Sequence, residues 1–117
     1  MAIETISPSD VAEGLRKGTH ILIDVREPLE YAAERIRGAL LYPLSSFDPA
    51  FLPAPVGKTL VFSCGLARRS ATALERCQAA GLPFSLHMAG GLQGWRMAGL
   101  PTLIVDHATG QFVEHSH

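Results

Sequence analysis

The stretch that decides the fold is Thr59-Leu60-Val61-Phe62-Ser63-Cys64-Gly65-Leu66-Ala67-Arg68-Arg69-Ser70-Ala71-Thr72. Its apolar start, residues 59–62, is typical of a buried strand, and a cysteine follows almost at once. Small residues and two arginines come next, and residues 69–80 have the pattern of a helix that ends at Gly81. This order predicts a thiol at the carboxyl end of a strand, facing the amino terminus of a helix.

Strands and helices alternate along the rest of the sequence. The patterns predict further helices over residues 8–17, 28–33 and 92–98, and further strands over residues 21–25, 38–42 and 84–88. Such alternation indicates an α/β fold with a mainly parallel central sheet of about five strands and helices on both faces. Residues 102–105 and 111–113 are expected to pair as a hairpin. In sheets of this kind the active site lies beyond the carboxyl ends of the strands.

Length and composition limit the class of protein. A chain of 117 residues is expected to form one domain, with a core over about residues 5–101 and a C-terminal extension over 102–117. A net charge of −1 predicts no basic face for nucleic acid or acidic lipid. The apolar runs are too short for a membrane span, and the first residues do not resemble an export signal.

The number and spacing of the cysteines indicate the redox state of the protein's compartment. Cys64 and Cys77 are the two cysteines in the sequence, in neither CxxC nor metal-finger spacing. This argues against a disulfide framework or a structural zinc and favours a reducing cytoplasm. We therefore expect a cytoplasmic protein with no metal site.

Cys64 has two interpretations, an inert buried thiol or a nucleophile. Its neighbours favour the nucleophile. Gly65 and Ala67 leave room for the backbone to curl into a ring of N–H donors, and Arg68 and Arg69 add positive charge. Unpaired N–H groups and the positive end of a helix dipole both stabilise a thiolate.

Four motifs resemble the rhodanese family of single-domain sulfurtransferases, over roughly residues 5–101. They are Ile23-Asp24-Val25-Arg26-Glu27-Pro28-Leu29-Glu30-Tyr31, Ile36-Arg37-Gly38-Ala39, Cys64-Gly65-Leu66-Ala67-Arg68-Arg69-Ser70 and Ala89-Gly90-Gly91-Leu92-Gln93-Gly94-Trp95. The resemblance implies a rhodanese-like enzyme of the thiosulfate sulfurtransferase type that needs no cofactor.

The resemblance also implies the reaction. The Cys64 thiolate takes the sulfane sulfur of a small anionic donor such as thiosulfate, or of a persulfide, and a thiol or protein acceptor, or cyanide, then removes it. The residues implied to bind the substrate and the persulfide, chiefly through their amides, are Gly65, Leu66, Ala67, Arg68, Arg69 and Ser70. Arg69 matches the family position that often bears a cation facing the substrate.

Three positions depart from the family pattern. Ala67 stands where glycine is usual, so a positive φ there costs about 1 kcal/mol. Glu34 and Arg35 replace a common glycine and histidine before Ile36.

Other residues are expected to support the site or the core. Asp24 and Arg26 are assigned mainly a structural role, with Asp24 capping a turn and Arg26 paired with Glu30; the alternative is that they line the cleft. Trp95 and Cys77 are predicted in the core, and His87 as a satisfied core or cleft histidine rather than a base.

Two other functions fit the same loop. A non-enzymatic persulfide carrier or regulatory module would use it to deliver sulfur to a partner protein. A phosphatase on the same fold needs an arginine six positions after the cysteine, where this sequence has Ser70. The carrier therefore stays open, and the phosphatase is disfavoured.

Overall fold

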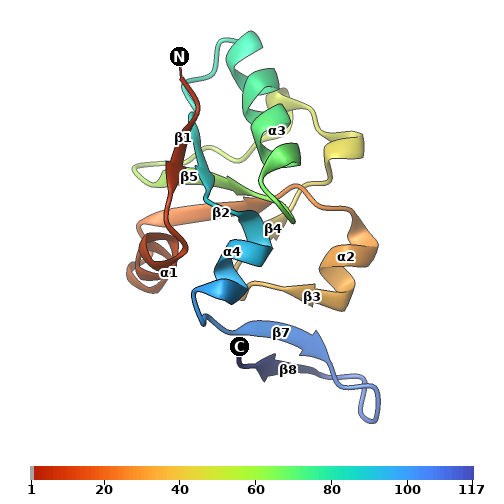
Figure 1. Ribbon diagram of the computed structural model, residues 1–117. Helices are drawn as coiled ribbons and strands as arrows, with labels where there is room; N and C mark the ends of the chain where they lie inside the picture. The colour runs from red at the N-terminus through yellow and green to blue at the C-terminus, as the bar shows by residue number, and fades with distance from the viewer. Residues whose placement is uncertain (1) are drawn as a thin grey trace.

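A computed structural model describes residues 2–117 (Figure 1). The helices are α1 (Pro8–Lys17), α2 (Pro28–Ala33), α3 (Arg68–Ala79) and α4 (Gly91–Met97), with 3-10 turns at Leu44–Ser46 and Pro49–Phe51. The strands are β1 (Glu4–Ile6), β2 (His20–Asp24), β3 (Glu34–Arg35), β4 (Leu40–Leu41), β5 (Thr59–Ser63), β6 (Leu86–Met88), β7 (Thr102–Val105) and β8 (Phe112–His115). No helix in this part of the chain is long and apolar enough to cross a membrane.

The central sheet brings the carboxyl ends of its strands together. Within residues 2–117 it has five strands in the order β1-β6-β5-β2-β4, and every neighbouring pair is parallel. Asp24 pairs with Ser63 at the ends of β2 and β5, so the segments that follow both strands leave from the same edge. This confirms the predicted α/β fold and places Cys64 at that edge.

Helices cover both faces of this sheet, as predicted, and each face has its own core. On one face, α3 contributes Ala73, Leu74 and Cys77, which pack with Phe62 and other residues of β2 and β5. On the other face, α1 and α4 contribute residues that pack with the sheet around Leu22, Val61 and Met88; they are Val11, Leu92 and Trp95. Two apolar layers of this kind anchor the loop that follows β5.

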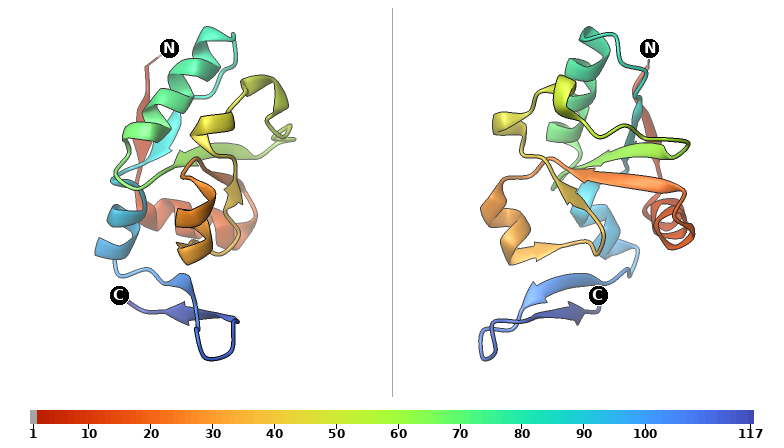
Figure 2. Two further views of the ribbon diagram at one scale, coloured as in Figure 1. Left: turned by 90° about the vertical axis from the view of Figure 1, so that its right-hand side faces the viewer. Right: turned by 180° about the vertical axis from the view of Figure 1, so that it is seen from behind.

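A second, antiparallel sheet lies away from the first, at the end of the molecule where α2 and α4 are found (Figures 1 and 2). It has the order β3-β7-β8 within the described residues. The expected hairpin is confirmed, although β8 runs from Phe112 to His115 instead of 111–113. β3 was not predicted; it pairs Glu34 with Ile104 and Arg35 with Leu103.

Several predicted boundaries are wrong by one or two residues. Gly38 has a φ of +88°, outside the extended region, so the strand expected over 38–42 is confined to Leu40–Leu41. The strand expected over 84–88 begins at Leu86, where pairing with Glu4 of β1 starts. β1 itself was missed, because three residues at a sheet edge give a weak pattern.

Candidate active site

Cys64 lies directly after β5 and is buried, with 1% of its surface exposed. Its Sγ accepts a hydrogen bond from the Ser70 backbone N–H at 3.4 Å, and its thiol donates to the Ser70 hydroxyl oxygen at 3.5 Å. Both of these Ser70 groups belong to the first turn of α3. The loop therefore bends back on itself, and its last residue contacts the sulfur of its first.

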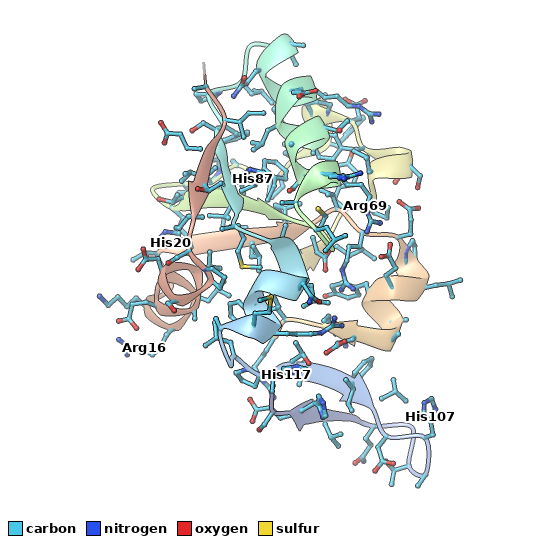
Figure 3. All side chains as sticks on the ribbon, in the orientation of Figure 1. Arg16, His20, Arg69, His87, His107 and His117 are labelled. Carbon is cyan, nitrogen blue, oxygen red and sulfur yellow. The ribbon has the colours of Figure 1, made fainter. Side chains whose placement is uncertain are left out.

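Ser70 connects the cysteine to a histidine in the neighbouring strand. The Ser70 Oγ lies 2.8 Å from Nδ1 of His87 in β6 and 3.2 Å from the carbonyl oxygen of Ala67. Burial lowers the pKa of His87 and favours the neutral imidazole. Figure 3 shows His87 beside the sheet, on the side of α3. His87 is thus a satisfied buried histidine, as predicted, but no sequence pattern indicates that its partner is Ser70.

The amides of residues 65–69 are without backbone partners. Within residues 2–117, no backbone carbonyl oxygen accepts a hydrogen bond from any of them. These amides precede or begin α3, where the helix dipole is positive. The loop thus has the donors that an anion needs, whether it is a thiolate, a persulfide or a bound substrate.

The turn before α4 holds the other side of the loop. The Leu92 N–H donates to the Cys64 carbonyl oxygen at 2.7 Å, and the Gln93 N–H donates to the Gly65 carbonyl oxygen at 3.2 Å. Gly91, with a φ of +58°, lies so close that a Cβ there would be 2.4 Å from the Cys64 carbonyl oxygen. This turn therefore needs glycine at Gly91 and fixes the backbone on which the thiol is mounted.

Ala67 has a φ of +75°, in the left-handed region that favours glycine. It is the residue directly before α3, which begins at Arg68 rather than at the predicted residue 69. The expected strain at this position is therefore present.

We expect Ala67→Gly to stabilise the protein by up to about 1 kcal/mol, since glycine adopts this φ without a Cβ clash. The measurement is the midpoint of thermal unfolding, which should rise by a few degrees. Ala71→Gly, inside α3, is the matched control and should lower the midpoint instead. A fall for Ala67→Gly as large as that for Ala71→Gly would contradict the account of strain.

A cavity of about 210 Å³ opens over the loop. Its lining residues are Arg26, Glu30, Gly65, Leu66, Leu92, Gln93 and Arg96. Larger hollows exist elsewhere, such as one of about 470 Å³ lined by Tyr42 and Phe51, but none of the residues that line it belongs to the loop 64–70. The chemistry of the loop, rather than cavity size, marks the cavity over Gly65 as the candidate active site.

Arg69 is bound by a carboxylate on α2. Its two terminal guanidinium nitrogens lie 2.5 Å and 3.0 Å from the two carboxylate oxygens of Glu30. The hydrogen bond with Arg69 lowers the pKa of Glu30 to about 2, and the same contact raises the pKa of Arg69. Figure 3 shows Arg69 at the start of α3, on the side of α2. Arg68 is exposed, and neither Arg68 nor Arg69 is among the residues that line the cavity over Gly65.

Asp24 and Arg26 form a buried ion pair below the cavity, with 5% and 4% of their surfaces exposed. The Asp24 carboxylate accepts from the Arg26 backbone N–H at 3.0 Å and from Arg26 Nη2 at 2.9 Å. Nη1 of Arg26 donates to the backbone carbonyl oxygen of Glu30 at 3.4 Å, not to the Glu30 carboxylate. The expected pairing of Arg26 with the Glu30 side chain is therefore wrong. The pair shapes the turn after β2, and Arg26 also lines the cavity.

Two of the residues that depart from the family pattern, Glu34 and Arg35, contact α4 and the second sheet. Glu34 binds Arg96 of α4 and accepts a hydrogen bond from Thr102. The Arg35 guanidinium lies 3.8 Å from the centre of the Phe112 ring. Glu34 and Arg35 thus fix the C-terminal hairpin, labelled at His107 and His117 in Figure 3.

The remaining candidates lie in the core. Cys77 is fully buried in α3, and desolvation raises the pKa of its thiol to about 11. Trp95 is 5% exposed and donates from Nε1 to the Pro101 carbonyl oxygen. Both residues lie where the sequence predicted. No cluster of three or more histidine, cysteine, aspartate or glutamate side chains in residues 2–117 has the arrangement of a metal site.

Comparison with known proteins assigns this chain to a family. The sequence profile of the rhodanese-like domain matches residues 7–98. The chain belongs to the rhodanese-like domain family. This family includes sulfurtransferases.

The rhodanese-like relatives come from several organisms. An uncharacterized protein of Synechocystis, slr1261, is 41% identical over 104 residues, covering 89% of this chain and 58% of the relative. The probable adenylyltransferase/sulfurtransferase MoeZ of Mycobacterium tuberculosis is 33% identical over 104 residues, covering 86% of this chain and 26% of MoeZ. The chain thus spans little more than half of one curated relative and about a quarter of the other.

A solved structure extends the comparison to the fold. The rhodanese-related protein of Thermoplasma volcanium has a TM-score of 0.70 and 27% identity, covering 85% of this chain and 96% of the other. The five-stranded parallel arrangement found within residues 2–117 is therefore that of a rhodanese-like domain.

Proposed function

We propose that this rhodanese-like domain is a sulfurtransferase that carries sulfane sulfur as a persulfide on Cys64. The observation that carries the proposal is the position of the thiol. Cys64 lies at the end of β5, and its Sγ accepts a hydrogen bond from the Ser70 N–H. Among residues 2–117, no backbone carbonyl oxygen accepts from the loop amides 65–69. A buried thiolate without a cationic base needs donors of this kind.

The first half-reaction forms the persulfide. The Cys64 thiolate attacks the sulfane sulfur of thiosulfate or of a thiol persulfide and forms a new S–S bond. The donor's own S–S bond breaks, and its electron pair leaves with sulfite or with a thiolate. No net redox change occurs, and the loop amides stabilise the anion on the transferred sulfur.

The second half-reaction returns the thiolate. An acceptor anion, either cyanide or a thiolate on a small molecule or a protein, attacks the outer sulfur of the persulfide. The S–S bond on Cys64 then breaks, and its electron pair returns to Sγ. No step needs a cofactor or a general base once the thiolate exists. The two free cysteines favour a reducing compartment such as the cytoplasm for this cycle.

An enzyme and a carrier would differ in how many sulfur atoms each protein molecule transfers. An enzyme of the thiosulfate sulfurtransferase type releases many thiocyanate molecules per protein when thiosulfate and cyanide are both in excess. A carrier that serves a partner protein loads one sulfur on Cys64 and releases it slowly to small acceptors. We expect turnover, because the cavity over Gly65 and Leu66 is open to small molecules. A single stoichiometric burst would favour the carrier, and no loading at all would reject both.

A further inference from the structure

The arginines around the cavity over Gly65 are paired with carboxylates. Arg26 and Arg96 line the cavity, and the Arg69 guanidinium lies beside the lining residue Gly65; each of these three arginines has a carboxylate partner. The pairs are Arg26 with Asp24, Arg69 with Glu30, and Arg96 with Glu34. Arg69, the cation at the position implied to face the substrate, is therefore already paired with a carboxylate of the protein itself.

The pair between Arg69 and Glu30 is held by more than charge. It has two parallel contacts, the geometry in which arginine binds a carboxylate most firmly. Glu30 is also anchored at the start of α2, since its Oε1 accepts from the Glu27 backbone N–H at 3.0 Å. The side chains are 35% and 40% exposed, so water weakens the attraction without changing this geometry.

We infer that Glu30 is a specificity-determining residue, because it holds both guanidinium nitrogens of Arg69 and withholds that cation from sulfur oxyanions. This inference rests on the proposed function. A thiosulfate dianion entering the cavity meets the Glu30 carboxylate and finds only backbone amides to bind. A protonated thiol persulfide carries no charge on its sulfane sulfur and does not need the cation.

The lining of the cavity agrees with a thiol persulfide as the donor. Leu66 is 69% exposed and forms part of the lining, so it offers an apolar contact to the carbon atoms of a thiol. In the transfer, Sγ of Cys64 bonds to the outer sulfur of the neutral persulfide, and the donor's S–S bond breaks. The inner sulfur leaves as a thiolate, and the proton of the persulfide stays on the transferred sulfur.

The test is Glu30→Gln, which removes the charge but keeps an Oε1 to accept from Glu27. We expect kcat/KM for thiosulfate, measured by sulfite release in excess cyanide, to rise about tenfold as Arg69 becomes available. With 2-hydroxyethyl persulfide as donor, kcat/KM should change by less than about threefold, because its sulfane sulfur carries no oxyanion.

Two controls connect the gain to Arg69. In the double variant Glu30→Gln with Arg69→Gln, the gain with thiosulfate should disappear. Glu13→Gln makes the same change in the exposed Glu13–Arg16 pair of α1 and should leave kcat/KM unchanged for both donors. If Glu30→Gln lowers the unfolding temperature below that of the assay, Glu30→Ala replaces it.

The outcomes separate this inference from the function on which it rests. If neither donor loads Cys64 in the unmodified protein, the proposed function fails. If the unmodified protein transfers sulfur but Glu30→Gln leaves thiosulfate turnover unchanged, Glu30 does not set specificity. A gain that persists in the double variant would also overturn the role of Arg69.

Discussion

Cys64→Ser is expected to abolish sulfur transfer, lowering turnover by about 1,000-fold or more, because a serine hydroxyl cannot hold the transferred sulfur. The fold should survive, since serine fits the space and can still accept from the Ser70 N–H. Thiocyanate formation from thiosulfate and cyanide measures the loss, and circular dichroism checks the fold.

Cys77→Ser is the matched control. Cys77 is also fully buried, but it lies in α3 among core residues and takes no part in the loop. Activity should be retained, with a stability loss of about 1 kcal/mol for burying a hydroxyl. Retained activity in Cys64→Ser, or lost activity in Cys77→Ser alone, would show that the sulfur is carried elsewhere.

Gly91→Ala is expected to give the second largest loss, about 100-fold in kcat/KM. The new Cβ would lie 2.4 Å from the Cys64 carbonyl oxygen and 2.8 Å from the carbonyl carbon of Gly65, so the loop backbone must move. That movement breaks the hydrogen bonds from Leu92 and Gln93 and shifts the thiol from its donors. Steady-state kinetics of the purified variant measures the effect.

Gly81→Ala is the control that distinguishes displacement of the Cys64 loop from the strain of an alanine at positive φ. Gly81 also has a positive φ, +81°, but a Cβ there meets nothing within 4 Å. We expect a stability loss of about 1 kcal/mol and unchanged kinetics. Equal activity losses in Gly81→Ala and Gly91→Ala would mean that the contact between Gly91 and the loop does not position the thiol.

The main sheet was predictable from sequence because its signals are local. Buried parallel strands such as His20–Asp24 and Thr59–Ser63 are continuous apolar runs, and α1, which precedes the first of them, has the capping residues Ser7 and Gly18. β1 and β3 escaped prediction for the opposite reason. Each has two or three residues, and each forms only because a distant strand, β6 or β7, supplies its hydrogen bonds.

The charge pattern of the site was the least predictable part. Sequence spacing marks Arg69 as a cation near Cys64, but Glu30 comes 39 positions earlier and meets it only when α2 and α3 are in place. The bond between Ser70 and His87 likewise joins a helix to a strand. The sequence therefore predicted a candidate nucleophile, Cys64, and the loop around it, but not that Glu30 pairs with Arg69 or that His87 contacts Ser70. Ala67 is different, because its strain was expected from the loop pattern and is present.

The most direct test of the central claim is the mass of the intact protein after brief exposure to a sulfane sulfur donor. We predict the addition of one sulfur atom, its location on Cys64 by peptide mapping, and its removal by cyanide with release of thiocyanate. Both thiosulfate and 2-hydroxyethyl persulfide should be tried as donors, because a protein that prefers one of them could give no mass change with the other. If the mass is unchanged with both donors, or if the sulfur is found on Cys77 instead, Cys64 is not the sulfur carrier.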